Sequence, residues 1–213
     1  MSQNLCVICG VDMGEMNPRQ LCRKTYCERE LIRKTYVINI IGGPGIGKTT
    51  MSALLFARLK MKKYIAEYVQ EYAKKLVWLK KYDILNDQYK VSTKQYKVLK
   101  SMVSEVDFII TDGPLLHGIY YNRENKSNTS NVEKTEEKIK EYYNSFNNIN
   151  ILLIRGNYEY EQAGRYHTEN QAKQIDIELK KILNQLGLEY LEISAEEKNI
   201  DQIIKYIEEY ISE

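Results

Sequence analysis

The chain has 213 residues, of which 43% are hydrophobic and 28% are charged, and its formal net charge is +2. A chain of this length can bury a core, and it suggests one main domain with room for a small appendage. The near balance of charge argues against a protein that coats nucleic acid or a membrane surface. No apolar run approaches the ~18 residues that span a bilayer, and the first residues lack the order of a signal peptide. We therefore expect an intracellular, cytoplasmic protein with no membrane partner.

All four cysteines lie near the N-terminus, at Cys6, Cys9, Cys22 and Cys27. Their spacing, C-x2-C-x12-C-x4-C, with a glycine after the first pair, resembles a zinc knuckle followed by a second pair of ligands. Four thiolates would close a tetrahedron around Zn2+ and leave no position for a substrate, which indicates a structural site. Metal binding would also explain how about 30 residues fold without a core of their own.

Disulfides or free thiols are the alternatives for these cysteines, although intracellular proteins rarely keep disulfides. A small zinc finger of this kind can dock a protein or a nucleic acid, or can simply stabilise the fold. We predict a four-cysteine zinc-binding module at residues 1–33, followed by a second domain at 34–213.

The second domain alternates apolar runs with helical patterns. Strands are predicted at residues 36–41, 64–69, 106–111, 148–154 and 188–193, and helices at 49–61, 70–82, 88–105, 132–146, 169–186 and 199–211. The polar segment 122–131 is predicted to be a solvated loop. Strands that alternate with helices imply right-handed crossovers. The expected fold is α/β, a three-layer sandwich of the P-loop NTPase type in which a five-stranded parallel sheet has helices on both faces.

The segment after the first predicted strand, IGGPGIGKTT, matches the Walker A pattern G-x-x-x-x-G-K-[ST]. Its position between a buried strand and a helix makes this a strong signal for nucleotide binding. Backbone N–H groups would wrap the phosphates, Lys48 would reach the β and γ phosphates, and Thr49 would ligate Mg2+. The predicted nucleotide-binding residues are Gly42, Gly43, Pro44, Gly45, Ile46, Gly47, Lys48, Thr49 and Thr50.

A candidate Walker B acid, Asp112, follows the third predicted strand in the segment FIITDGP. A carboxylate there would hold the Mg2+ together with Thr49. ATP-driven motors normally carry a second acid directly afterwards, whereas this chain has Gly113 and Pro114. The missing acid favours a kinase over a motor.

A kinase also needs an acid near the acceptor hydroxyl and a cationic lid. Glu71 follows the second predicted strand and is our candidate general base, although a glutamate favoured by the helix dipole is an equal alternative on spacing alone. Arg155 and Arg165 flank a polar segment after the fourth strand, which predicts a lid over about residues 155–168. His167 is interpreted as a neighbour of that lid rather than a catalyst.

Further residues could recognise an acceptor molecule, but each is more often a packing or surface residue. Gln88 and Gln95 could read a base or an amide, and Trp78 could stack on it. Four tyrosines could stack in the same way, at positions 68, 72, 89 and 96.

Several of these motifs together resemble a known family. Walker A, VQEYAKKLV, ITDGPLL and the block YEQAGRYHTENQAKQID are similar to the AAA-type P-loop family that includes the ribosylnicotinamide kinase domain of NadR. The resemblance spans about residues 36–211 and leaves the cysteine module outside. It implies a nucleoside-kinase-like fold, with Glu71 and Asp112 in the cleft and Arg155 and Arg165 on the lid. Members of the family differ in substrate, so the resemblance implies the fold more strongly than the acceptor.

The leading hypothesis is an ATP- and Mg2+-dependent kinase acting on a nucleoside-like or nucleotide small molecule. The catalytic residues would be Lys48, Glu71, Asp112, Arg155 and Arg165. The alternative is an ATP- or GTP-binding switch, or a slow NTPase, whose zinc module docks a protein or nucleic-acid partner. The sequence does not distinguish ATP from GTP.

Overall fold

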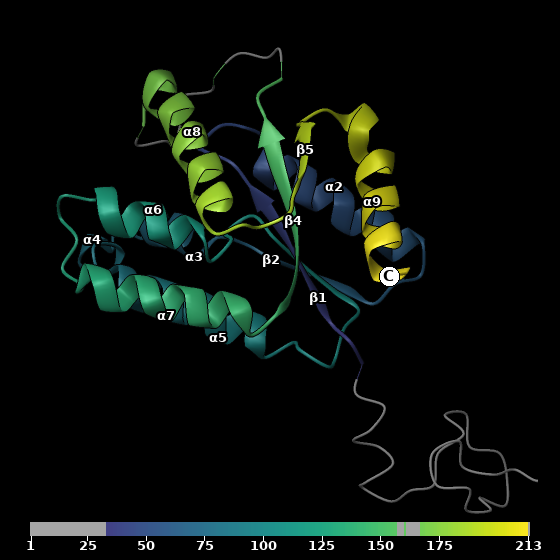
Figure 1. Cartoon of the computed structure of the whole chain (residues 1–213), viewed down its shortest axis with the longest axis horizontal. Coiled ribbons are helices and arrows are strands. Elements are labelled where there is room, and N and C mark those ends of the chain that lie inside the picture. The colour runs from purple at the N-terminus through teal and green to yellow at the C-terminus, as the bar shows by residue number, and fades with distance from the viewer. Residues whose placement is uncertain (1–32, 157–159, 161–166, 213) are drawn as a thin grey trace, which may run out of the picture. The chain divides into compact units, whose positions relative to one another are not determined.

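The computed structural model describes residues 33–156, 160 and 167–212 (Figure 1). Contacts divide the chain into two units, Met1–Lys34 and Thr35–Glu213. The four cysteines predicted to bind zinc lie outside the described residues, so the zinc module stays a prediction. No helix in the described part of the chain is both long and apolar enough to cross a membrane.

A five-stranded parallel sheet forms the centre of the second unit. Its strands are β1 (Tyr36–Ile41), β2 (Ala66–Val69), β3 (Phe108–Thr111), β4 (Asn147–Ile154) and β5 (Leu191–Ser194). Their order across the sheet is β2-β3-β1-β4-β5, so the strand before the Walker A segment is central. The predicted five-stranded parallel sheet is therefore confirmed.

Helices occupy the connections between strands. They are α2 (Lys48–Met61), α3 (Tyr72–Trp78), α4 (Tyr82–Leu85), α5 (Gln88–Lys100), α6 (His117–Glu124), α7 (Val132–Asn144), α8 (Glu169–Gln185) and α9 (Ile200–Ser212), with a 3-10 turn at Glu197–Asn199. Helices α2 and α9 lie on one side of the sheet, and α5, α6, α7 and α8 lie on the other (Figure 1). The predicted helices on both faces are confirmed.

Side chains on the two faces of β1 pack into two separate hydrophobic cores, because successive side chains of a strand point to opposite sides. Ile38 and Ile40 pack with residues of α2 and α9. Val37 and Ile41 pack instead with residues of α5 to α8. All four side chains are buried. Burial on both faces explains why this strand reads as a continuous apolar run in the sequence.

The predicted helix 70–82 is shorter in the structure, where only residues 72–78 form α3 and a second short helix, α4, begins at Tyr82. Helix α3 ends at Trp78, and Lys80 has a left-handed backbone with φ 54°. The N–H of Lys80 bonds to the carbonyl of Val77 at 3.1 Å, and that of Lys81 bonds to the carbonyl of Leu76 at 3.0 Å. This is the hydrogen-bond pattern of a Schellman cap, which stops the helix before α4 begins.

Segment 122–131 is not simply the solvated loop that its composition predicts. Its first residues complete α6, a helix that the sequence analysis missed. Asn122 is buried; its amide donates to the carbonyl of Val132 at 2.7 Å and its oxygen accepts from the Asn128 amide at 2.9 Å. The buried Asn122 amide, bonded to its neighbours, thus supports the α6–α7 connection without an apolar anchor.

Candidate functional site

The Walker A segment forms a loop between β1 and α2. Gly45 and Gly47 have φ values of 75° and 98°, in the left-handed region that glycine adopts without cost. The Lys48 ammonium donates to the carbonyl of Gly43 at 2.9 Å, so it lies over the loop's own backbone. A glycine-rich turn that leads into a helix N-terminus, with a lysine folded across it, fits the phosphates of a nucleotide.

The carboxylate of Asp112 connects three elements at the end of β3. One oxygen accepts the Thr49 hydroxyl at 2.7 Å and the Tyr68 hydroxyl at 2.8 Å. The other oxygen accepts the backbone N–H of Glu71 at 2.9 Å. Thr49 and Asp112 supply the hard oxygen ligands that Mg2+ prefers, so this pair fits the predicted metal. Among the described residues, no group of three or more His, Cys, Asp or Glu residues could hold a metal ion.

Glu71 lies directly against the position after Asp112. A Cβ placed on Gly113 would lie 2.6 Å from the Glu71 Cα and 2.8 Å from its Cβ. Atoms cannot approach so closely, so no side chain fits at position 113 while Glu71 keeps its place. The acid that a motor carries at this position is excluded by packing, and Glu71 is the acid present beside Asp112.

Burial sets the electrostatics of the cleft. It raises the pKa of Glu71, and the nearby positive charge of Lys48 offsets part of this rise. Burial also lowers the pKa of Lys48, while the carboxylates of Glu71, Asp112 and Asp176 act in the opposite direction. Glu71 is thereby a better proton acceptor than an exposed glutamate.

His117, at the start of α6, contacts the nucleotide loop. Its Nε2 accepts the backbone N–H of Gly42 at 3.4 Å. Burial, together with the charge of Lys48, lowers the pKa of His117 well below its ordinary value. The imidazole is therefore neutral and supports the loop without adding charge.

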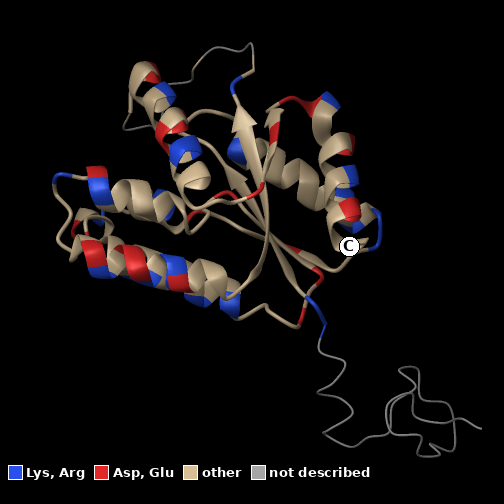
Figure 2. Ribbon diagram, viewed as in Figure 1, with Lys and Arg blue, Asp and Glu red and all other residues tan. Residues whose placement is uncertain are grey.

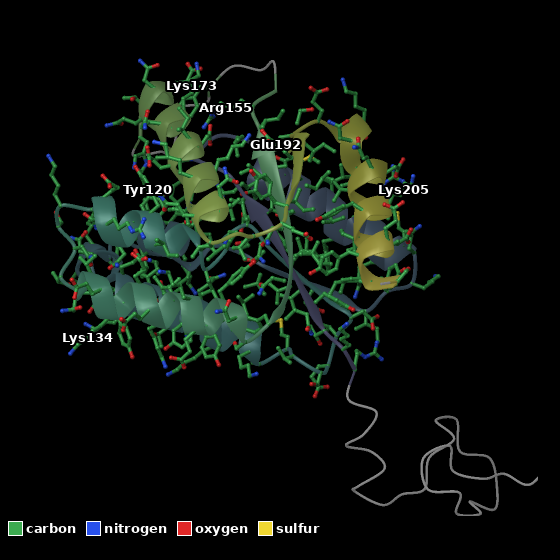
Figure 3. The ribbon with its side chains drawn as sticks, in the orientation of Figure 1. Tyr120, Lys134, Arg155, Lys173, Glu192 and Lys205 are labelled. Atoms are coloured by element: carbon green, nitrogen blue, oxygen red, sulfur yellow. The ribbon has the colours of Figure 1, made fainter. Side chains whose placement is uncertain are left out.

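Arg155, labelled in Figure 3, follows β4. A salt bridge and a hydrogen bond hold its side chain. Its Nε lies 2.7 Å from a carboxylate oxygen of Asp176 on α8, and its NH2 donates to the carbonyl of Pro44 at 2.9 Å. The other oxygen of Asp176 accepts the N–H of Gly43 at 2.6 Å. Arg155 and Asp176 together fasten α8 to the nucleotide loop.

The rest of the predicted lid is only partly described. Arg165 lies outside the described residues, so its role stays a prediction. The Tyr160 ring lies 5.8 Å from the Arg155 guanidinium, and its hydroxyl donates to the carbonyl of His167 at 2.8 Å. The His167 ring lies 6.3 Å from that of Tyr121. The contacts place Tyr160 beside Arg155, and His167 beside Tyr121 of α6.

Some of the residues considered for acceptor recognition make contacts within the fold, and two others are exposed. The Gln95 side chain is buried and bonds to the N–H of Tyr72 and the hydroxyl of Thr111. The Gln88 amide is buried and donates to Ser92. The Tyr96 ring stacks on Tyr142 with centroids 4.0 Å apart. Trp78 and Tyr89 are exposed.

The sequence analysis missed two residues of this site, and one of them had a detectable signal. Asp176 stands within the buried stripe of α8, between Ala172 and Leu179. An acid inside the apolar face of an amphipathic helix is unusual and marks a specific partner. His117 belongs to the helix that was missed, so no pattern pointed to it.

The described site is built at the carboxyl ends of four neighbouring parallel strands. The nucleotide loop follows β1, Glu71 follows β2, Asp112 follows β3 and Arg155 follows β4. Open parallel sheets bind their ligands at this edge.

Solved structures with a similar fold include two of NadR and one nucleoside kinase. The crystal structure of NadR in complex with NAD and AMP-PNP has a TM-score of 0.56 and 18% identity, over 84% of this chain and 51% of that chain. NadR in complex with NR has a TM-score of 0.63 and 17% identity, over 84% and 53%. Deoxyadenosine kinase from M. mycoides, with products dCMP and a flexible dCDP bound, has a TM-score of 0.54 and 20% identity, over 81% and 99%.

At these identities the similarity shows a common fold, and the chain spans about half the length of the NadR chains. No curated protein matches the sequence. The AAA domain family matches residues 37–199, which include the nucleotide loop and all five strands except Tyr36, the first residue of β1. The chain therefore belongs to the AAA domain family.

Proposed function

We propose that the chain is a P-loop phosphotransferase that moves the γ-phosphoryl group of ATP to a hydroxyl of a nucleoside-like or nucleotide small molecule. The observation that carries this proposal is the packing of Glu71 against Gly113, beside Asp112. This packing leaves the carboxyl of Glu71 on the side of the cleft where we propose that an acceptor enters. It also leaves no room for a motor-type acid after Asp112.

Each residue has a role in the proposed transfer. The acceptor oxygen attacks the γ-phosphorus, its proton passes to the Glu71 carboxylate, and the bond from the γ-phosphorus to the bridging oxygen breaks to release ADP. Lys48 stabilises the charge on the phosphates. Thr49 and Asp112 would hold Mg2+, which supplies further neutralisation of that charge. Arg165 would cover the transferring group from the lid, and Arg155 would reach it with guanidinium N–H groups that are not bonded to Asp176 or Pro44.

The nucleoside-type acceptor is supported by the fold's similarity to a deoxyadenosine kinase and to NadR bound to NR. These proteins share the fold at low identity, so they support the class of acceptor and do not identify the molecule.

An acceptor screen with γ-labelled ATP tests the proposal. Nucleosides, nucleotides and nicotinamide riboside are offered in turn, and label is expected on one of them. Lys48→Ala, which removes the phosphate contact but no core packing, is expected to abolish the transfer and retain the wild-type circular dichroism spectrum. Label that appears only as free phosphate would instead support the nucleotide-dependent switch.

We also propose that Cys6, Cys9, Cys22 and Cys27 hold one structural Zn2+ and that the module binds a protein or nucleic-acid partner. The support is the cysteine spacing. Metal analysis of protein purified under reducing conditions is expected to give one zinc per chain, and Cys9→Ser is expected to lose it. Zinc-free wild-type protein would exclude the module.

A further inference from the structure

An exposed surface of lysines and aromatic rings extends from the candidate site along α3 and α4. We define this basic aromatic surface as Lys74, Lys75, Trp78, Lys80, Lys81 and Tyr82. Trp78 is 68% exposed and Tyr82 is 50% exposed, whereas Leu76 of the same helix as Trp78 is buried in the domain. Exposed apolar side chains that gather in one short segment, rather than being scattered singly, indicate a binding surface.

Positive charge is concentrated in the same part of the chain. Figure 2 shows the basic residues in blue and the acidic residues in red over the described fold. Between Tyr72 and Lys100 there are eight lysines and two aspartates, although the net charge of the whole protein is only +2. One of the aspartates, Asp87, is paired with Lys90 at 2.8 Å and caps α5. The lysines of the basic aromatic surface form no ion pair with any other residue that the structure describes. The charge of Lys74 also acts on Glu71 in the cleft, whereas the charges of Lys75, Lys80 and Lys81 are available to an external partner.

The basic aromatic surface is continuous with the nucleotide site. The Lys74 ammonium lies 3.5 Å from the Thr49 hydroxyl. Lys74 and Trp78 are four residues apart in one helix, so they lie on the same face of α3. Helices α3, α4 and α5 pack against one another, which fixes the rings and ammonium groups on one support.

We propose that the basic aromatic surface binds single-stranded nucleic acid. Unpaired bases stack on exposed aromatic rings, and lysines follow the phosphates of the strand, which together is the common way of binding single strands. A duplex hides the faces of its bases from such rings. A membrane is a poorer fit, because interfacial helices need a long apolar face. Helix α3 has only seven residues, and the large apolar side chains exposed at its end are Trp78 and the C-cap residue Leu79. The proposal is independent of phosphotransfer, since binding needs no ATP.

The protein provides its own optical probe, because Trp78 is its only tryptophan. The full-length chain is titrated with an unlabelled deoxythymidine 20-mer, and base stacking is expected to quench the fluorescence of Trp78. An abasic strand of equal length, which keeps the phosphates, is expected to bind at least fivefold more weakly and to quench little. Binding is expected to weaken with salt, by about 0.7 in logarithmic slope for each phosphate contact.

A matched pair of glycine substitutions tests the role of charge. Lys80 and Lys63 are both exposed, both have a left-handed backbone, and both end a helix with the same Schellman hydrogen bonds. Glycine suits either position, so Lys80→Gly and Lys63→Gly remove one charge each without harming the fold. Lys80→Gly is expected to lower affinity for the 20-mer severalfold and to reduce the salt slope. Lys63→Gly is expected to leave both unchanged.

Trp78→Ser tests stacking, with binding followed by anisotropy of a labelled 20-mer. The expected loss is about tenfold, within the range known for one stacked base. The proposal is overturned if the wild type does not bind the 20-mer at low salt, if the two glycine variants lose affinity equally, or if the abasic strand binds as well as the 20-mer. Binding to phosphatidylserine vesicles without binding to the 20-mer would assign the surface to a membrane and would also overturn it.

Discussion

The buried carboxyl of Glu71 lowers the stability of the folded state at neutral pH. Burial raises its pKa above the ordinary value of 4.5, so the folded state holds the proton more tightly than the unfolded state does. The stability that this group contributes is full below the unfolded pKa and is lost as pH rises through the folded pKa. At neutral pH the ionised carboxylate is therefore unfavourable for folding.

In Glu71→Gln, the melting temperature should fall less between pH 4 and pH 7 than in the wild type, because the variant has no carboxyl that must lose its proton in the buried site. The same variant should lower turnover at least 100-fold, since a positioned base contributes about 10²- to 10⁴-fold. It should also remove the rise of activity with pH that reports the raised pKa. Calorimetry and a pH–rate profile measure these effects.

Glu67→Gln is the matched control for Glu71, because it makes the same change on an exposed residue of β2. It should alter neither melting temperature nor turnover. If Glu71→Gln retained full turnover on the true acceptor, the assignment of the general base would be wrong.

Gly113 is required by the close approach of Glu71. In Gly113→Ala, the added methyl group would meet backbone and Cβ atoms that cannot rotate away, so Glu71 or β3 must shift. We expect a loss of about 1–3 kcal/mol in the free energy of unfolding, typical of overpacking, together with a fall in turnover. Denaturant titration and the transfer assay measure the two losses.

Gly187→Ala separates this effect from the general cost of replacing a glycine. Gly187 has φ 63°, and nothing lies within 4 Å of the point that an added methyl group would occupy, so the variant meets only backbone strain of about 1 kcal/mol. Its turnover should stay normal. Equal turnover in the two variants would contradict the proposed contact between Gly113 and Glu71.

At the scale of elements, long apolar or strongly periodic segments were predictable and short ones were not. The strand β1 is buried on both faces and reads as an apolar run, and α8 carries a regular buried stripe. Helix α6 has eight residues and begins shortly after a proline, in a segment whose signals resemble a loop. Its place depends on packing against α7 and α8, which no local pattern reveals.

Some features of the candidate site were likewise predictable from the sequence, and others were not. The nucleotide loop and Asp112 follow from local motifs that have a known physical purpose. The link from Asp112 to the Glu71 backbone joins segments 41 positions apart, and that from Gly43 to Asp176 joins segments 133 apart. Contacts over such distances arise from the order of strands, so the sequence pattern did not contain them.

Replacing Asn122 tests whether its hydrogen bonds stabilise α6. Asn122 is itself buried, and Asn122→Ala would leave the carbonyl of Val132 and the Asn128 amide without this partner. The expected loss is about 1–3 kcal/mol in the free energy of unfolding. Denaturant titration measures it, and Lys126→Ala, an exposed change in the same connection, should stay within about 0.5 kcal/mol. A loss as small as that of the control would show that the amide network does not hold α6.

At the scale of the whole molecule, the sheet turns separate segments into one nucleotide site. The residues that would contact phosphates and metal come from the ends of β1 and β3, while those on the acceptor and lid sides come from β2 and β4. Because β1 lies at the centre of the sheet, ligand bound to its loop touches elements on both sides. Nucleotide binding should therefore stabilise the domain as a whole.

AMP-PNP with Mg2+ at 100 times its dissociation constant should add about 2.7 kcal/mol to the stability of the folded state. For a domain of this size, that is a rise of about 5–10 °C in melting temperature. A chelator should remove much of the rise, because Thr49 and Asp112 would no longer share a metal with the phosphates. Asp112→Asn should keep only the part that does not depend on Mg2+, and Lys48→Ala should lose most of both parts. Scanning calorimetry with and without Mg2+ measures each part, and an identical rise under the two conditions would remove Thr49 and Asp112 from metal binding.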